Sequence, residues 1–569
     1  MYRRAVEIEP GLPLARLNLG RALADTGQLD AALEHLHAAA HLAPEDVGVW
    51  QSLADVLARF RFDVYSPEVE VVLVECLSQP QIEPAYLALT AASLLLADAQ
   101  FLGIVKSTGE GTGVLRLDAA TVRQLSRPLL LLLLENALIP EPAFEDLISH
   151  LRRAAIFARK EGSLGSDALL SEVLAAIAHQ SFLSEYVHQE SSDETRAIEW
   201  LKDKIEQALE RGNAVSEVDL ALFACYRPLH ELQGDSALPT ASMPLFSRLI
   251  LRQVTEPAEE ALIRDELPVL TPIGNAVSRA VQGQYEQSPY PRWMRPPSTG
   301  RAFPLALRLR TLFPHSASVG DVPQRPTILI AGCGTGRHVA STALLNPDSS
   351  ILAVDLSRAS LAYAVRRANE LGLQNVEFAQ ADILELDQLG RRFDLIECSG
   401  VLHHMQNPSE GLRVLAGRLN SGGKMKIGLY SEIGRRSVVA SKMLIAERGY
   451  AADGKGIRDA RAAILALPAE DGARGVADSI DFYSLSGCRD LLFHIQERRY
   501  TLEDIEALLA PLRLEFLGFE FDSRTTLLDY RREYANDPAA NSLRNWSEYE
   551  AHYPSTFAGM YQFWVASHP

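Results

Sequence analysis

The sequence predicts an α/β chain in which an all-helical N-terminal region precedes a doubly wound parallel sheet. Two patterns carry this prediction. From about 328 to 430, five short apolar runs alternate with helix-like segments, as strands and crossover helices do in a parallel sheet. Before about 280, apolar residues recur at helical spacing, as in Ile198, Leu201, Ile205 and Leu209, and Gly212 ends that segment.

The first 64 residues contain a helical repeat. Pro10 and Pro44 are 34 residues apart, and the residues between them resemble the tetratricopeptide (TPR) consensus at Leu19, Gly20, Leu23, Gly27, Ala32, Leu36 and Ala39. Trp50 stands where a following repeat would carry its aromatic residue. Such arrays need about three units for stability. We therefore expect either that N-terminal repeats are missing from this chain or that the following helices complete the array.

Residues 65–280 are expected to form a helical domain without a catalytic pattern. Repeat arrays often bind peptides or proteins, which favours a docking surface. The alternative is a spacer or a dimerisation element, and the pattern alone leaves both open.

A Pro-rich, aromatic linker arm is expected at 281–326. Prolines at 289, 291, 296 and 297 stiffen it and prevent helix formation. Its aromatic residues Tyr285, Tyr290 and Trp293 either cover a ligand pocket as a lid or anchor the arm on the surface of the next domain. The sequence does not separate these two interpretations.

The first apolar run of the sheet breaks into a glycine-rich loop, ILIAGCGTGRH, at 328–338. Gly332, Gly334 and Gly336 permit a tight turn and a close approach of a ligand to the backbone. A strand, a glycine loop and a helix start are typical of a nucleotide-cofactor site. The GxGxG spacing differs from the GxGxxG fingerprint of dinucleotide-binding proteins, which disfavours a dehydrogenase.

Polar residues follow the next strands where each strand ends. Asp355 comes about 20 residues after the glycine loop, where a carboxylate can bind both hydroxyls of a ribose. The third run, VEFAQADIL, ends in Asp382 and Ile383, and the fourth, FDLIECSGVLHHM, contains Ser399 and Gly400. Ligands of such sheets bind at the carboxyl ends of the strands, so these residues should share one site.

In this order, the motifs resemble those of class I S-adenosylmethionine-dependent methyltransferases, which have a Rossmann-like seven-stranded sheet. The resemblance covers about 300–432 and implies S-adenosyl-L-methionine as cofactor. It places the methionine part on the glycine loop, the ribose on Asp355, the adenine near Asp382, and the methyl group near Ser399. The cofactor-binding residues implied are Gly332, Cys333, Gly334, Gly336, Asp355, Leu356, Asp382, Ile383, Ser399 and Gly400.

One position departs from the family pattern. Family members usually carry Asp or Glu two residues before the first loop glycine, where this chain has Ile330. Another group must then bind the methionine ammonium.

The rest of the methyltransferase region is expected to extend over 327–569. Two runs with strand-like composition, near 512–521 and 560–567, fit the antiparallel sixth and seventh strands. The interval before them suggests a helical cap insertion at about 435–510, because long insertions near strand ends are usually functional. Within it, Thr501 and Asp504 resemble a capping box, and the Ala-, Gly- and Asp-rich stretch 451–480 is expected to be mobile. A turn is expected at Asn420–Gly423.

Composition disfavours several classes of function. A net charge of −18 and a pI near 5.3 disfavour nucleic acid as a partner, because such binding relies on Lys and Arg. The apolar run Leu129–Leu134 is much shorter than the ~20 residues that cross a bilayer, and no signal peptide is recognised, so we expect a cytoplasmic protein without a membrane contact. The five cysteines show no metal-ligand spacing; we expect buried thiols and no metal.

Methyl transfer needs a general base only when the acceptor starts protonated. His403 and His404 are the first candidates, since imidazole titrates near neutrality, and Tyr430 is a further candidate, as are Glu432, His494 and Glu497. We favour a protein or peptide acceptor docked on the TPR-like region. The alternatives are a small-molecule O- or N-methyltransferase whose repeats mediate homodimer formation or partner binding, and a non-catalytic cofactor-binding regulator.

Overall fold

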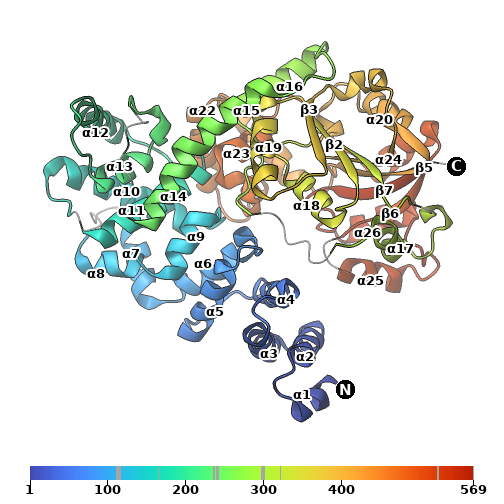
Figure 1. Cartoon of the computed structure of the whole chain (residues 1–569), viewed down its shortest axis with the longest axis horizontal. Coiled ribbons are helices and arrows are strands. Elements are labelled where there is room, and N and C mark those ends of the chain that lie inside the picture. The colour runs from blue at the N-terminus through green and yellow to red at the C-terminus, as the bar shows by residue number, and fades with distance from the viewer. Residues whose placement is uncertain are drawn as a thin grey trace.

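The computed structural model describes residues 1–109, 117–165, 167–234, 238, 243–295, 302–320, 322–521 and 524–567. A helical N-terminal half lies beside an α/β C-terminal half (Figure 1). Pro296 and Pro297 of the predicted arm fall outside the described residues.

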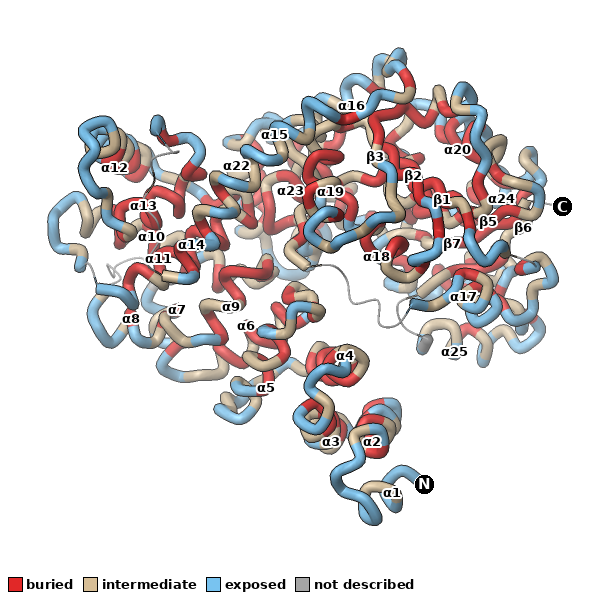
Figure 2. Tube along the Cα trace, viewed as in Figure 1, coloured by how far each residue is buried: buried red, intermediate tan, exposed pale blue. Residues whose placement is uncertain are grey.

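The N-terminal half is all-helical, as predicted. Gly20 of α2 would place a Cβ 2.6 Å from Leu36 Cγ of α3, so a small residue is required where these helices cross. One continuous apolar core runs from Leu17 to Leu249, so the first repeats pack directly on the helices that follow (Figure 2). The helices are α1 Tyr2–Ile8, α2 Pro13–Asp25, α3 Leu29–Leu42, α4 Val47–Leu57, α5 Pro67–Ser78, α6 Ala88–Leu96, α7 Ala99–Gly109, α8 Ala119–Leu125, α9 Pro128–Asn136, α10 Pro142–Glu161, α11 Ala168–Leu183, α12 Ser192–Glu210, α13 Glu217–Ala224 and α14 Pro244–Ile250.

No single helix in the described ranges is both long and apolar enough to cross a membrane. The segments Pro84–Leu96 and Ala99–Ser107 pass that test only as a pair, which is bent by 93°. Their larger apolar side chains, such as Leu94, Leu95 and Phe101, are buried in the protein core.

A helical connection leads from the first half to the sheet. α14 continues through a π-helical turn, Leu251–Thr255, into α15 (Glu256–Glu266), and α16 (Ala276–Gln287) follows (Figure 1). α15 packs on α19 (Arg358–Glu370), where the buried Arg366 pairs with glutamates of both helices. Between α15 and α16 the chain runs along the sheet edge: the Leu270 N–H donates to the Gln380 carbonyl at 2.9 Å.

The sheet has seven strands in the order β3-β2-β1-β4-β5-β7-β6, which confirms the predicted fold class. β1 to β5 are parallel, and β7 pairs antiparallel with both β5 and β6. Alternate residues of β1 enter two different cores, so helices cover both faces. The strands are β1 Thr327–Ala331, β2 Ser350–Asp355, β3 Val376–Gln380, β4 Phe393–Ser399, β5 Leu419–Leu429, β6 Leu514–Phe519 and β7 Tyr561–Ser567.

Helices pack on both sides of this sheet. α17 (Leu305–Leu312), α18 (Arg337–Leu345) and α19 contribute to one core, and α20 (Pro408–Gly417), α24 (Leu502–Leu509), α25 (Arg524–Glu533) and α26 (Leu543–His552) to the other. The turn predicted at Asn420–Gly423 falls within the bounds of β5, at a break in its ladder: the pairing with β4 passes from Leu419 to Lys424, and Gly422 takes a φ of +69°.

The cap lies between β5 and β6 and has its own apolar core. It contains α21 (Arg436–Arg448), α22 (Gly454–Leu465) and α23 (Leu485–Phe493), and the predicted capping box forms at the start of α24. The expectation that 451–480 is mobile is wrong, because Ile457 and Ile464 share a face of α22 that is buried in the cap core. The five cysteines are unpaired and buried, as predicted.

Candidate active site

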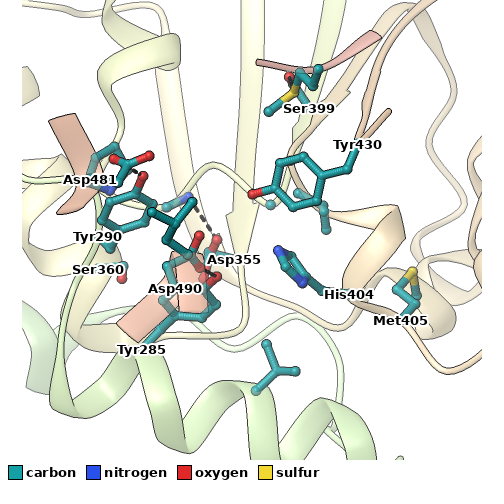
Figure 3. Close-up of a pocket in the computed structure, with 18 of the residues that line it drawn as sticks. Tyr285, Tyr290, Asp355, Ser360, Ser399, His404, Met405, Tyr430, Asp481 and Asp490 are labelled. Carbon is teal, nitrogen blue, oxygen red and sulfur yellow. Dashed lines mark hydrogen bonds between the residues drawn. The ribbon is translucent and has the colours of Figure 1, made fainter. Parts of the chain in front are cut away.

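A cavity of about 970 Å³ opens where the parallel strands end (Figure 3). Its walls come from the glycine loop, the ends of β2, β3, β4 and β5, the arm before β1, and the cap. Of the sequence-predicted residues, those lining it are Gly332, Cys333, Gly334, Asp355, Leu356, Asp382, Ile383, Ser399, Gly400, His404 and Tyr430. Gly336 and His403 are not among the lining residues.

At each of the three loop positions, a different feature of the structure requires glycine. Gly332 has a φ of +76°, and a Cβ there would lie 2.3 Å from Cγ2 of Val401. Gly334 has a φ of +51° and lies under the Tyr290 carbonyl, 3.1 Å from where its Cβ would be. Gly336 precedes α18 and lies against Ala364 of α19, so its role is helix packing rather than cavity lining.

Asp355 at the end of β2 fixes the loop. Its Oδ2 accepts the Gly334 N–H at 2.8 Å, and its Oδ1 accepts the Ser357 N–H at 2.9 Å. Burial raises the pKa of this carboxyl, although the two backbone donors oppose that shift. The carboxylate therefore connects the glycine loop to the start of α19.

Asp382 presents an unpartnered acceptor. Its Oδ1 accepts the Leu384 N–H at 3.0 Å, while its backbone N–H donates to the Thr271 hydroxyl at 2.8 Å. Its Oδ2 is buried, and no described residue donates a hydrogen bond to it. A donor from a ligand would satisfy this atom.

The arm is bound tightly over the glycine loop. The Thr335 hydroxyl donates to the Pro291 carbonyl, and the Trp293 indole donates to the Thr335 carbonyl at 2.9 Å. Trp293 is buried against Tyr363 and does not line the cavity, whereas Tyr285 and Tyr290 do. The two interpretations of the arm thus apply to different residues: the tryptophan anchors it and the tyrosines face the cavity.

The cap contributes two carboxylates that sequence reasoning missed. The Tyr290 hydroxyl donates to Asp481 Oδ1 and the Tyr285 hydroxyl to Asp490 Oδ1, both at 2.5 Å (Figure 3). Burial raises the pKa of both carboxyls. No local pattern marks these residues, since each partner lies about 200 residues earlier in the chain.

The two candidate histidines have different positions. His403 is fully buried and stacks on Tyr430 with ring centroids 3.7 Å apart, so it supports the wall from behind. His404 lines the cavity, and its Nδ1 lies 2.8 Å from the Gln496 carbonyl, which assigns the ring proton to Nδ1 and leaves a lone pair on Nε2. Burial lowers the pKa of His404 to about 4, so this ring is neutral at pH 7.

His404, Asp490 and His494 also lie close enough together for metal binding by distance. However, His494 Nδ1 accepts the Gln496 N–H at 3.1 Å, which puts the ring proton on Nε2. That tautomer has no lone pair for a cation at the buried Nε2. The three side chains therefore pack together without a metal-ligand arrangement, and the His404 and His494 rings stack with centroids 3.6 Å apart.

A buried acid lies beside Ile330, one strand away. Glu397 of β4 is in register with Ile330, which is buried in the sheet core. Glu397 Oε2 accepts from His338 Nε2 and from the Thr342 hydroxyl, each at 2.7 Å. Burial alone would raise the pKa of Glu397, but the His338 charge and hydrogen bond lower it to about 2. This carboxylate orients His338, which lines the cavity.

The parallel sheet, the glycine loop and the strand-end acids define a Rossmann-like methyltransferase class. Comparison with protein families agrees: residues 326–447 match a methyltransferase domain, and residues 1–57 match a tetratricopeptide repeat. The chain belongs to the S-adenosylmethionine-dependent methyltransferases and carries TPR repeats at its N-terminus.

Individual relatives cover parts of the chain. An uncharacterized protein of Synechococcus is 33% identical over 300 residues, which are 48% of this chain and 68% of that protein. A tRNA (guanine-N(7)-)-methyltransferase of Rubrobacter xylanophilus is 43% identical over 68 residues, 12% of this chain and 30% of that enzyme. The structure of PKMT2 from Rickettsia typhi aligns at 20% identity over 47% of this chain and 53% of that one, with a TM-score of 0.36.

The residues present fit S-adenosylmethionine. The glycine loop is a cradle that a Cβ would fill, and the orphaned Asp382 Oδ2 accepts the kind of hydrogen bond that an adenine amino group donates. When bound, the cofactor supplies an electrophilic methyl group together with its own leaving group.

Proposed function

We propose that this chain methylates a side chain of a protein or peptide that docks on the TPR repeats and the helices after them. The observation that carries this proposal is a direct contact between the helical region and the rim of the cavity. Arg337, which lines the cavity, forms an ion pair with Glu83, in the segment after α5. A chain lying along the repeats would thus reach the cavity without leaving the protein surface.

A second contact holds this junction in place. The Arg295 guanidinium of the arm donates to the carbonyls of Leu77, Gln79 and Ile82, at 2.8, 2.7 and 3.2 Å. Arg295 is a residue of the same arm that covers the glycine loop. The end of α5 and the arm are therefore hydrogen-bonded to each other beside the cavity.

We propose cofactor contacts residue by residue. The methionine part would lie along Gly332 and Gly334, the ribose hydroxyls would bind Asp355, and the adenine amino group would bind Asp382 Oδ2. Leu356 and Ile383 would flank the adenine, with Cys333 as a small residue of the loop and Ser399 and Gly400 beside the methyl group. Gly336 acts indirectly, by allowing α18 to pack on α19.

The protein's part in the reaction is mainly orientation and exclusion of water. Where the acceptor is protonated, His404 is the candidate base, because its Nε2 lone pair is free and the ring is neutral at pH 7. His403 would act only by positioning Tyr430. A small-molecule acceptor is the second candidate, favoured by the cavity volume of about 970 Å³.

The test is transfer of labelled methyl from S-adenosylmethionine into a lysate of the native host that lacks this gene. The wild type is compared with Leu14→Glu/Val71→Glu, which alters two exposed apolar residues of α2 and α5. Leu262→Glu, at a 70% exposed residue of α15, is the matched control. Label in discrete protein bands that only the double variant loses supports the proposal. Label confined to small molecules points to the alternative enzyme, and no transfer at all points to a regulator.

A further inference from the structure

We infer that Asp481, Asp490, Tyr285, Tyr290 and Tyr430 form a binding site for an alkylammonium group, built between the cap and the arm. No relative or family match assigns these residues. The inference concerns the same cavity as the proposed function and rests on it for the presence of the cofactor.

The first observation is unpaired negative charge. Neither Asp481 nor Asp490 forms an ion pair with any residue in the described parts of the chain. The nearby cation Arg435 is already bound to Glu497 at 2.9 Å. Asp490 is 5% exposed, and buried charges in proteins are normally paired because water no longer solvates them. A cation in the cavity would supply the missing partner.

The second observation is independent of the carboxylates. Tyr430 is 8% exposed, and its hydroxyl has no hydrogen-bond partner among the described residues. It points into the cavity from the side opposite Asp481 and Tyr290 (Figure 3). Both faces of its ring are occupied, by His403 at 3.7 Å and by the Arg435 guanidinium at 3.8 Å. The ring is held in place, so the hydroxyl has a fixed direction toward a ligand.

The position of the site indicates which ammonium it binds. The Tyr290 carbonyl lies over Gly334, and the neighbouring Pro291 carbonyl accepts the Thr335 hydroxyl. The backbone of Tyr290 therefore lies beside the glycine loop, at the proposed methionine end of the cofactor, and the Tyr290 hydroxyl binds Asp481. The acid usual in this family is replaced by the buried Ile330, and Glu397 beside it is already used by His338. The favoured source of the ammonium is thus the methionine part of the cofactor, and the other source is an amine of the acceptor.

Calorimetric binding separates these sources without needing turnover. S-adenosylhomocysteine carries the ammonium, whereas 5′-methylthioadenosine lacks it. We expect Asp481→Asn and Asp490→Asn each to weaken S-adenosylhomocysteine binding at least tenfold and to leave 5′-methylthioadenosine binding within twofold. Asn still accepts the tyrosine hydroxyl, so the change is one of charge. Asp478→Asn, at an exposed cavity-lining carboxylate of the cap, is the matched control and should change neither affinity more than twofold.

A second titration uses n-butylamine with the cavity saturated by S-adenosylhomocysteine. If both Asp variants keep their affinity for S-adenosylhomocysteine but no longer bind butylammonium, the ammonium site exists and binds an amine of the acceptor. If both variants bind both probes as the wild type does, the inference is wrong. Tyr430→Phe should weaken binding of the ligand that the carboxylates bind by about threefold to tenfold. If this variant also loses 5′-methylthioadenosine binding, the cavity has collapsed and the specific role of Tyr430 is overturned. Because no methyl acceptor is required, these results stand apart from the test of the proposed function.

Discussion

Replacing Glu145 by Ala breaks a buried ion pair between the helical region and the cap. Arg461 of α22 donates to both carboxylate oxygens of Glu145 on α10, at 2.8 and 2.7 Å. The Arg461 side chain is 2% exposed, and that of Glu145 is 14% exposed. Arg461 also donates to the Phe482 carbonyl at 2.6 Å, next to Asp481. The pair thus links the helical region to a wall of the cavity.

The size of the effect follows from the geometry. Removing one partner of a buried ion pair costs about 3–5 kcal/mol, because the other charge stays buried and unpaired. Arg461 keeps the Phe482 carbonyl and lies 4.6 Å from the Phe482 ring centroid, which places the expected cost near the lower end, about 3 kcal/mol. Burial raises the pKa of Glu145, but Arg461 outweighs it and the net shift is downward. The ion pair therefore contributes to the stability of the folded protein above the unfolded-state carboxyl pKa, and this contribution is lost as the pH falls below that pKa.

Hydrogen exchange is the direct assay for this prediction. A cost of about 3 kcal/mol raises the opening of the cap about a hundredfold, seen as faster exchange of α22 and α23 amides. The double variant Glu145→Leu/Arg461→Met should recover most of the protection, since two apolar side chains replace the pair without leaving a charge. Unchanged exchange of α22 and α23 in Glu145→Ala would refute the reasoning, as would a double variant no better protected than the single one.

Three further results are expected. Glu397→Gln should lower the free energy of unfolding by about 3 kcal/mol near neutral pH, because the folded protein lowers the pKa of Glu397 from 4.5 to about 2. The difference in stability between variant and wild type should narrow below pH 4.5, and equal urea midpoints at pH 6 would contradict this prediction. Gly332→Ala should weaken S-adenosylhomocysteine binding more than tenfold. Adding Val401→Ala should restore only part of this affinity, because it relieves the clash of the new Cβ with Val401 but leaves residue 332 at a positive φ. Full restoration of the affinity would show that this φ is unimportant. His404→Phe should lower kcat at least a hundredfold and leave cofactor affinity unchanged. The wild-type rate should show no titration of the His404 ring between pH 6 and 8. An unchanged kcat in His404→Phe would show that His404 is not the base.

The sequence predicts those parts of the fold that depend on local pattern. The strands, the glycine loop and the strand-end acid Asp355 follow from apolar runs and their spacing, and all occur where expected. The turn at Asn420–Gly423 occurs as an irregularity inside β5 rather than before it, because the ladder to β4 resumes only at Lys424.

The parts of the site that depend on contacts between distant residues cannot be predicted from local sequence pattern. Asp490 and Tyr285 are 205 positions apart, and neither has a neighbour that signals a site. His403 and His404 are adjacent, yet only one lines the cavity, since the short helix Leu402–His404 directs them differently. One signal was available: Glu397 is an acid inside an apolar strand, which indicates a buried partner.

The position of β7 constrains how the protein can be made. β7 lies between β5 and β6 in the sheet, but it is the last of the three to be synthesised. While the chain is emerging from the ribosome, β5 has an open edge and β6 has no neighbour, and unpaired strand edges invite aggregation. The catalytic half can therefore complete its sheet only after residue 567 has emerged, whereas the helical half, whose core ends near residue 249, can fold long before.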